Sequence, residues 1–505
     1  MSLSFPAGRR PRALPGLGAI GRADLAVLAF CALGAGNLWA RRGAGDAFNV
    51  GDPGDFVVGF GLICLAGVLC MLAVRRPAVA PGAIVCSAAI AGQVIVQPYY
   101  LLPVQVMYLT GVVLAAVPLV RNRWLAWPMV AVVAGIVCVP MTQYWTWGAS
   151  KIDVFQEVQG STLALLHGHN PYGPVVAVFL DSPLHHPLYG SGSLNYGPAV
   201  VLLSLPARLI GDVRLTVVAL NIAILVAALV WVRRAWPSRN LGPTIAALWV
   251  ASPFVPFMVV LEWTDSFSVA GLAWWLVLRD RHRNWAIACL AVALASKPTM
   301  LPLMVPLVLW VRPVRGELLR STVAAVAVIA PFAIWTGVAQ FVYDTVGIFT
   351  DLPTRHDAVN VNGLSVALGH GLLAPSLLLV ATIVVATVCL ARRPLDYGDM
   401  LAMGAALMIA ICFFAKQAFF NYYYNAAMAL LFVAGAGGLR PLTPLTSPIR
   451  ELREMAARVR RRQPVSSASA SPALLAVSQP ASRRALRLPS PAPSRGASTP
   501  SPPAS

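Results

Sequence analysis

The sequence predicts an all-α protein that crosses a membrane many times. Hydrophobic residues make up 58% of its 505 residues and charged residues only 11%, whereas soluble domains carry about 25% charged residues. The apolar residues gather in repeated runs of about 20, the length that a helix needs to cross the hydrocarbon core. These runs are continuous rather than alternating, which favours helices over a closed β-barrel.

The number and direction of the spans follow from the runs and from the positive charges between them. About 13 to 14 runs are present, although 284–296 and 299–312 are short and interrupted by proline. Arginine-rich connections indicate the cytoplasmic side. We therefore expect a multi-pass cell-membrane protein with both termini cytoplasmic. Arg41 and Arg42 are the one clear exception, because they are positive charges in a connection that this topology places outside. The short apolar segment 196–211 is expected to lie as a helix at the outer interface.

Composition divides the chain into four parts. Residues 1–22 form a basic cytoplasmic arm, 23–123 an N-terminal four-helix membrane module, and 124–438 a larger membrane domain with a long extracytoplasmic loop at 143–213. Residues 439–505 are rich in Pro, Ser, Ala and Arg, so we expect a disordered cytoplasmic tail. The net charge of +19 comes largely from the connections and this tail. That distribution argues for contact with membrane lipids and against nucleic-acid binding.

Polar residues collect in the loops that this topology places outside. The loop 143–213 is much longer than a connection between two helices needs to be. Acids or a lysine also occur at 262–265, at Lys297, at 339–369 and at 416–422. Charges near a span usually face a protein interior or a wet cavity, so we expect these segments to form the rim of one site. The alternative is that these outer loops are simply hydrated.

Asp153 is the candidate catalytic residue because it follows a span almost immediately. A carboxylate held there can act as general base toward a hydroxyl group; the alternative is an aspartate that caps a helix. Glu157 would share a helix face with Asp153. The two acids leave a divalent cation possible, but they do not define a metal site.

Lys297 is the candidate phosphate ligand. It sits between two short apolar runs, where an ammonium group must reach the interface or meet an anion. Arg355 and Lys416 are candidates for the same role, with surface exposure as the alternative. His167, with the other histidines of its Pro/Gly-rich loop, lacks the fixed geometry of a zinc site. Tyr422 belongs either to an interfacial aromatic belt or to a surface that stacks on a sugar.

Read together, these motifs resemble the GT-C superfamily of integral-membrane glycosyltransferases, and most closely the actinobacterial polyprenyl-phosphate-mannose-dependent mannosyltransferase-like proteins. The matching order is Asp153-x-Phe155, "LLHGHNPYG" (165–173), "NYGPAVVLLSLPARLIG" (195–211), Asp265, "SKPTML" (296–301) and "KQAFFNYYY" (416–424). The resemblance covers about 124–438 and rests on the order of the motifs. The chain departs from the family at Tyr196-Gly197-Pro198, where the family has Tyr-Pro-Pro or a similar motif.

The resemblance implies transfer of a sugar, mannose or another hexose or pentose, from a polyprenyl-phosphate donor to a cell-envelope glycan or lipid acceptor. Asp153 would take the acceptor proton, and cations would offset charge on the leaving phosphate. The implied substrate-binding residues are Glu157, His167, Asn170, Tyr172, Tyr196, Asp265, Lys297, Arg355, His356, Lys416, Gln417 and Tyr422. No cofactor is certain.

Two other functions remain open. A multispan transporter or lipid-linked-sugar flippase would suit the number of spans, although the sequence shows no internal repeat. A ligase that moves whole glycans from a lipid carrier is the third possibility, but such enzymes usually place their long external loop near the C-terminus. A labelled substrate separates these functions, because only an enzyme makes a new glycosidic product.

Overall fold

Nineteen α-helices and no strand make up the part of the chain that this computed structural model describes, which confirms the all-α prediction. The described residues are 20–44, 52–96, 104–149, 153–172, 194–348, 358–416, 418–437 and 439, and the side chains of 139–149 and Asp153 are outside the description. All described residues belong to one compact unit, 1–451. The predicted tail lies outside them, apart from Leu439.

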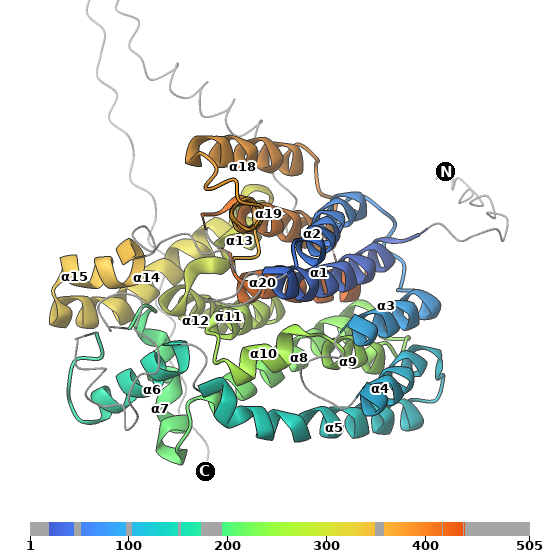
Figure 1. Cartoon of the computed structure of the whole chain (residues 1–505), viewed down its shortest axis with the longest axis horizontal. Helices are drawn as coiled ribbons and strands as arrows, with labels where there is room; N and C mark the ends of the chain where they lie inside the picture. The colour runs from blue at the N-terminus through green and yellow to red at the C-terminus, as the bar shows by residue number, and fades with distance from the viewer. Residues whose placement is uncertain are drawn as a thin grey trace, which may run out of the picture. The chain divides into compact units, whose positions relative to one another are not determined.

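The helices follow one another along the chain, with short 3₁₀ and π segments between some of them (Figure 1). They are α1 (Arg22–Ala44), α2 (Pro53–Ala73), α3 (Ala83–Val96), α4 (Val104–Ala116), η1 (Val117–Leu119), α5 (Arg123–Ala149), α6 (Asp153–Leu166), α7 (Pro198–Ile210), α8 (Arg214–Ala235), α9 (Gly242–Val250), α10 (Phe254–Val260), α11 (Asp265–Leu278), α12 (Arg283–Ser296), η3 (Pro298–Met300), α13 (Leu301–Trp310), α14 (Arg312–Thr336), α15 (Val338–Val342), η4 (Tyr343–Gly347), α17 (Val361–Ala367), α18 (Pro375–Leu390), α19 (Tyr397–Phe414) and α20 (Phe420–Gly435).

Five described helices, α1, α2, α8, α14 and α19, are long and apolar enough to cross a membrane. Two bent pairs raise this number to seven: α9 with α10, bent by 56°, and α12 with η3 and α13, bent by 110°. Six further apolar helices are shorter, at 10–17 residues within the described part. The protein is therefore a multispan helical membrane protein. This count covers the described residues, and the total of 13–14 spans stays a prediction.

The core lies around α20, which packs against α1, α11 and α19 (Figure 1). Residues on all sides of α11, α19 and α20 are buried. By contrast, α14 and α18 expose apolar side chains along their length, such as Val323 and Val380, as expected for helices that face lipid.

The segment 23–123 was predicted to be a separate four-helix module. In the structure two of its helices contact the core directly: α2 packs against α19, and α1 packs against α20.

Small residues bring α1 and α2 into close contact. A Cβ atom added to Gly59 of α2 would lie 2.2 Å from the backbone nitrogen of Ala40 in α1, and one added to Gly36 would lie 2.8 Å from the Gly59 carbonyl oxygen. Interfaces of this kind let two backbones approach closely, which is how membrane helices gain packing energy where no water can drive their association. The α1–α2 pair is thus a rigid part of the core.

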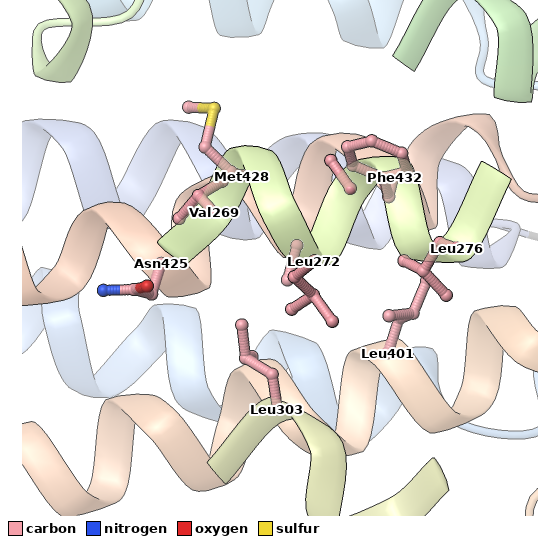
Figure 2. A pocket seen from close by; sticks show the side chains of 10 residues that line it. Val269, Leu272, Leu276, Leu303, Leu401, Asn425, Met428 and Phe432 are labelled. Atoms are coloured by element: carbon pink, nitrogen blue, oxygen red, sulfur yellow. The ribbon is translucent and has the colours of Figure 1, made fainter. Parts of the chain in front are cut away.

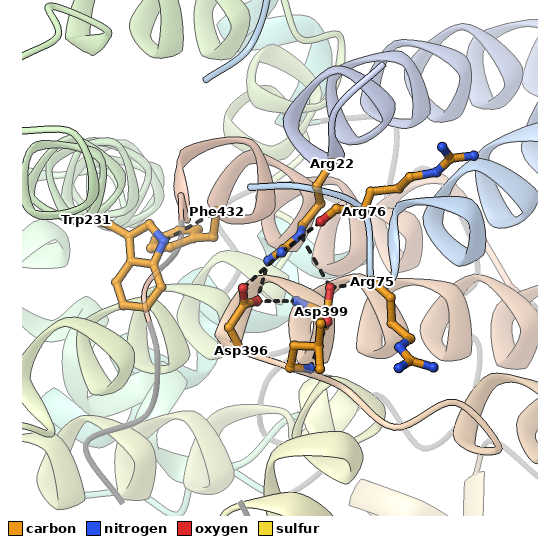
Figure 3. A network of polar contacts seen from close by, with 8 residues as sticks. Arg22, Arg75, Arg76, Trp231, Asp396, Asp399 and Phe432 are labelled. Atoms are coloured by element: carbon orange, nitrogen blue, oxygen red, sulfur yellow. Dashed lines mark hydrogen bonds and ion pairs between the residues drawn. The ribbon is translucent and has the colours of Figure 1, made fainter. Parts of the chain in front are cut away.

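A buried ion network joins the start of α1 to the start of α19 (Figure 3). The Arg22 guanidinium contacts Asp396 through both terminal nitrogens, one of them at 2.9 Å, and its Nε lies 3.3 Å from Asp399. Asp399 also accepts a hydrogen bond from the Arg75 backbone N–H at 2.9 Å. Arg22 and Asp399 are almost completely buried. We call this end of the helical bundle the Arg22 end.

Candidate functional site

A buried ion pair lies at the other end of the bundle. Lys297 Nζ donates a hydrogen bond of 2.9 Å to Asp265 Oδ2, and the side chains are 9% and 0% exposed. Asp265 is the first residue of α11, whose 14 residues separate it by about 20 Å from the opposite helix end. Lys297 has an extended backbone at the sharp bend between α12 and η3. The prediction that Lys297 occupies a broken apolar hairpin is confirmed.

Three uncharged side chains complete the coordination of Asp265. Asn421 Nδ2 donates at 2.6 Å to Oδ2, while Thr299 Oγ1 and Asn425 Nδ2 each donate at 3.2 Å to Oδ1. We call these five residues, Asp265, Lys297, Thr299, Asn421 and Asn425, the Asp265 cluster. A buried charge is tolerable only when it is paired and hydrogen-bonded, and here both oxygens of the carboxylate have donors.

Two tyrosine rings flank the ammonium group of Lys297. Its Nζ lies 4.7 Å from the ring centroid of Tyr422 and 5.5 Å from that of Tyr196, distances typical of cation–π contacts. Behind the cluster, Asn221 donates to Ser266 Oγ at 3.0 Å and accepts from the Tyr424 hydroxyl at 2.7 Å. The polar residues at this end therefore form two connected layers on α8, α11 and α20.

The segment Asn195–Gly197 joins the predicted outer loop to the cluster. The Gly197 N–H donates to the Ser296 carbonyl at 2.8 Å, and a Cβ at Gly197 would lie only 2.1 Å from the Ala295 carbonyl oxygen. A proline here would lose the donor and meet the same carbonyl. Position 197 of this chain therefore requires glycine.

Two contacts hold this segment against the polar stretch that follows α5. The Tyr172 hydroxyl donates to the Tyr196 carbonyl at 2.7 Å, and Asn195 Nδ2 donates to Glu157 Oε1 at 3.0 Å. Tyr172 and Glu157 are each 1% exposed. They therefore position Tyr196 next to Lys297, which brings Glu157, Tyr172, Tyr196, Asp265, Lys297 and Tyr422 into one connected set.

Among the other predicted site residues, Asn170 is joined to this set through Tyr172, because its Oδ1 accepts a hydrogen bond of 3.0 Å from the Tyr172 N–H. Its Nδ2 also donates to Thr336 of α14 at 3.1 Å, which holds the end of α6 against α14. His167 and Lys416 are exposed. Arg355, His356 and Gln417 lie outside the described residues. Asp153 begins α6, but its side chain is outside the description.

The sequence did not predict several residues of this site, namely Asn221, Thr299, Asn421 and Asn425. The spacing of Asn421 and Asn425 carried a usable signal, because two amides four residues apart lie on the same face of an otherwise apolar helix. Within the described residues no three His, Cys, Asp or Glu side chains converge as metal ligands.

Glu262 is a buried acid near the site. It lies on the turn between α10 and α11, is completely buried, and neither of its carboxylate oxygens has a hydrogen-bond partner among the described residues. Its backbone has φ of 52°, in the left-handed region that non-glycine residues rarely adopt. Burial raises the pKa of Glu262 well above its usual value; Asp212 raises it further, and Arg214 partly opposes this rise.

A small apolar cavity lies between α11, α13, α19 and α20, beside the Asp265 cluster (Figure 2). Of its described lining residues only Asn425 is polar; the others include Leu272, Leu303, Leu401 and Phe432. Asn425 is also a residue that bonds Asp265. The lining side chains are buried, so the cavity is an apolar interior space next to the cluster and too small for a complete ligand.

The chain matches no protein-family model, no curated protein and no solved structure. The fold defines a multispan α-helical membrane protein, and the site is an ion pair buried among uncharged donors at one end of its bundle.

Proposed function

We propose that the protein is a GT-C-like membrane glycosyltransferase that moves a sugar from a polyprenyl-phosphate donor to a cell-envelope glycan or lipid acceptor on the extracytoplasmic face. The supporting observation is the buried Asp265–Lys297 pair, which lies between two tyrosine rings and borders apolar side chains of α11, α13, α19 and α20. A polyprenyl-phosphate sugar joins a hydrocarbon chain to an anion, so a cation bordered by apolar residues suits its phosphate end.

Lys297 would hold the donor phosphate. An ammonium group has three hydrogen-bond donors, and among the described residues Lys297 donates one of them, to Asp265. The remaining donors and the positive charge would stabilise the negative charge that grows on the phosphate as the sugar leaves. The rings of Tyr196 and Tyr422 lie on the same ammonium group, where they can contact the sugar.

Asp153 would act as the general base toward the acceptor hydroxyl. It begins α6, and the same helix is joined to the Asp265 cluster through Glu157, Asn195 and Tyr196. In this mechanism the acceptor oxygen attacks the anomeric carbon, the carbon–phosphate-oxygen bond breaks, and Asp153 takes the proton of the hydroxyl. Glu157 and Tyr172 position the loop and are not required to touch the substrate.

The test is transfer in proteoliposomes that contain polyprenyl phosphate carrying labelled mannose and an extracted cell-envelope acceptor. Asp153→Asn should lower the rate of glycosidic product formation by about 100-fold or more, whereas Asp280→Asn, the same change at an exposed acid, should leave it unchanged. Undiminished transfer by Asp153→Asn would rule out the assignment of the base.

A transporter of lipid-linked sugars is the second candidate, and one observation favours it. Two broken spans, α9–α10 and α12–η3–α13, lead to the turn before Asp265 and to Lys297 respectively. Broken helices often surround the substrate site of transporters. In the same proteoliposome experiment a transporter would move the labelled lipid across the bilayer and leave it chemically unchanged.

A further inference from the structure

The Arg22 end of the bundle holds two connections side by side. Asp399 accepts hydrogen bonds from the backbone N–H of Arg75 at 2.9 Å and from that of Leu395 at 2.8 Å. Arg75 belongs to the connection between α2 and α3, and Leu395 to the connection between α18 and α19. Arg392 adds a further contact, because its Nη1 donates to the Met71 carbonyl of α2 at 2.8 Å. One buried carboxylate therefore joins the two connections.

Both connections contain the sequence Arg-Arg-Pro, and the exposed arginines are Arg75, Arg76, Arg392 and Arg393. The network around Arg22 uses only backbone atoms of the first pair: the Arg75 N–H and the Arg76 carbonyl, which accepts from Arg22 Nη2 at 3.2 Å. Figure 3 shows the guanidinium groups of Arg75 and Arg76 extending away from the network. Within the described part of the chain, the guanidinium groups of Arg75, Arg76 and Arg393 have no ion pair or hydrogen bond.

The positive charge of these arginines is not balanced by the connections themselves. The two connections carry four arginines and one acid, Asp396, and Asp396 is paired with Arg22. Asp399, which lies just inside α19, pairs with Arg22 and accepts the two backbone N–H groups. An excess of positive charge therefore remains exposed at the Arg22 end.

The backbone of Arg75 is strained. Its φ is 68°, in the left-handed region that non-glycine residues rarely adopt. Glycine would adopt this conformation at no steric cost, so an arginine here carries a penalty that its backbone contact does not require. Strain of this kind is concentrated at functional positions, which directs attention to the Arg75 side chain.

The lipid-facing surfaces of two helices lead to the four arginines. α2 exposes Val68 and Leu72 near its end, and α18 exposes Val384 and Val388 near its end, as expected for side chains that contact acyl chains. Both helices pack against α19. A phospholipid on this surface would have its acyl chains on α2 and α18 and its headgroup where the two helices end.

We propose that Arg75, Arg76, Arg392 and Arg393 form a binding site for the phosphate group of an anionic membrane phospholipid, whose acyl chains lie against α2 and α18. Guanidinium groups bind phosphate oxygens through charged and often paired hydrogen bonds. Positive charges predict that this end is cytoplasmic, where the leaflet carries anionic lipids that attract basic segments. The inference is independent of the proposed function.

The chain's own terminal segments do not suit this site. Residues 1–19 contain three arginines and no acid, and residues 440–505 contain more arginines than acids. Both segments therefore have the same sign of charge as the site. The anion that neutralises it comes from outside the chain.

The experiment measures lipid-dependent stabilisation of the full-length protein in neutral detergent at low salt. The probes are phosphatidylglycerol, phosphatidylcholine with the same acyl chains, and inorganic phosphate. A ligand that binds only the folded state raises Tm according to its affinity, so a titration gives the apparent affinity. We expect phosphatidylglycerol to raise the Tm of the wild type, and the two other probes to leave it nearly unchanged.

The double variant Arg75→Gln with Arg76→Gln should weaken phosphatidylglycerol binding by about 30-fold, because each arginine near an anionic headgroup contributes about a factor of five. Arg393→Gln alone should weaken it by about fivefold. The first two substitutions keep the backbone contacts to Asp399 and Arg22. The ligand-free Tm should therefore stay close to that of the wild type, which shows that the variant is folded.

Arg121→Gln with Arg123→Gln is the matched control, because these two arginines are also exposed and lie together at the start of α5. This variant should bind phosphatidylglycerol as the wild type does. An equal loss in the control would mean that lipid is attracted to basic surfaces in general, and undiminished binding by the Arg75/Arg76 variant would mean that these residues hold no lipid. Equal stabilisation by inorganic phosphate would indicate a site for a free anion, and equal stabilisation by phosphatidylcholine a site that does not recognise charge. Each of these four results would overturn the inference.

Discussion

Asp265 and Lys297 lie 32 residues apart in the chain and form an ion pair of 2.9 Å that is almost completely buried. The pair joins the first turn of α11 to the sharp bend after α12. Its net contribution to folding is modest, because removing two charges from water costs about as much as their attraction returns. Removing only one of the two residues is costly, because the charge of the other is then buried without a counter-charge.

The first prediction concerns the cost of removing one partner of the Asp265–Lys297 pair. Lys297→Met should lower the free energy of unfolding by about 3–5 kcal/mol, because Asp265 becomes an unpaired buried anion. The double variant Lys297→Met with Asp265→Asn should recover a large part of that loss. A thermal or denaturant unfolding series in detergent on the four proteins of the cycle measures the coupling.

The control for the cycle is the more exposed pair Arg42–Asp55, whose side chains are 49% and 15% exposed. Arg42→Met should cost no more than about 1 kcal/mol, as exposed ion pairs usually do. Equal losses for Lys297→Met and Arg42→Met would contradict the claim that burial makes the Asp265–Lys297 pair sensitive.

The second prediction concerns Gly197. Gly197→Ala places a Cβ against the Ala295 backbone, which cannot rotate away as a flexible side chain could. We expect a loss of about 1–3 kcal/mol from overpacking and weaker contact between Tyr196 and Lys297. The readouts are Tm and the transfer rate of the proteoliposome assay.

Gly316→Ala provides the comparison, because a Cβ at Gly316 meets nothing within 4 Å. It should leave transfer unchanged. Wild-type Tm and transfer in Gly197→Ala would show that the Tyr196 segment does not need its close approach to α12.

The sequence was sufficient to predict the helical class and to single out Asp265 and Lys297, because charges that interrupt apolar runs stand out without any structure. It did not identify Asn425 or Thr299 as partners of Asp265. Residues on all sides of α11 and α20 are buried, so no polar face tells which way a side chain points. Composition measures the length of an apolar run, but it does not reveal a bend within the run, such as the 110° bend at Lys297.

The third prediction concerns the α1–α2 contact. Gly59→Ala should destabilise the protein by about 1–3 kcal/mol, because the new Cβ would overlap the backbone of α1 and force the helices apart. Gly61→Ala lies two residues along the same helix, where a Cβ meets nothing within 4 Å. It should stabilise the protein by about 0.5–1 kcal/mol through helix propensity. Tm measurements on both variants test the difference in sign, and a stabilised Gly59→Ala would show that α1 and α2 are not closely packed.

The last prediction uses the pH dependence of Glu262. Burial raises its pKa in the folded protein above the value in the unfolded chain, so the folded state binds the proton more tightly. The stabilising contribution of the bound proton is fully present below the unfolded pKa of about 4.3. It is lost progressively as pH rises through the raised folded pKa.

Glu262→Gln replaces the carboxyl group with an uncharged amide of the same shape, which has no proton to lose. We expect its Tm to be close to that of the wild type near pH 4.5 and to exceed it by a growing margin as pH rises toward 9. Unfolding curves in detergent across this range give the margin, with Asp280→Asn as the control for an acid-to-amide change at an exposed position. A margin that shrinks with rising pH would mean that Glu262 is ionised in the folded protein and that its buried carboxylate has a cationic partner.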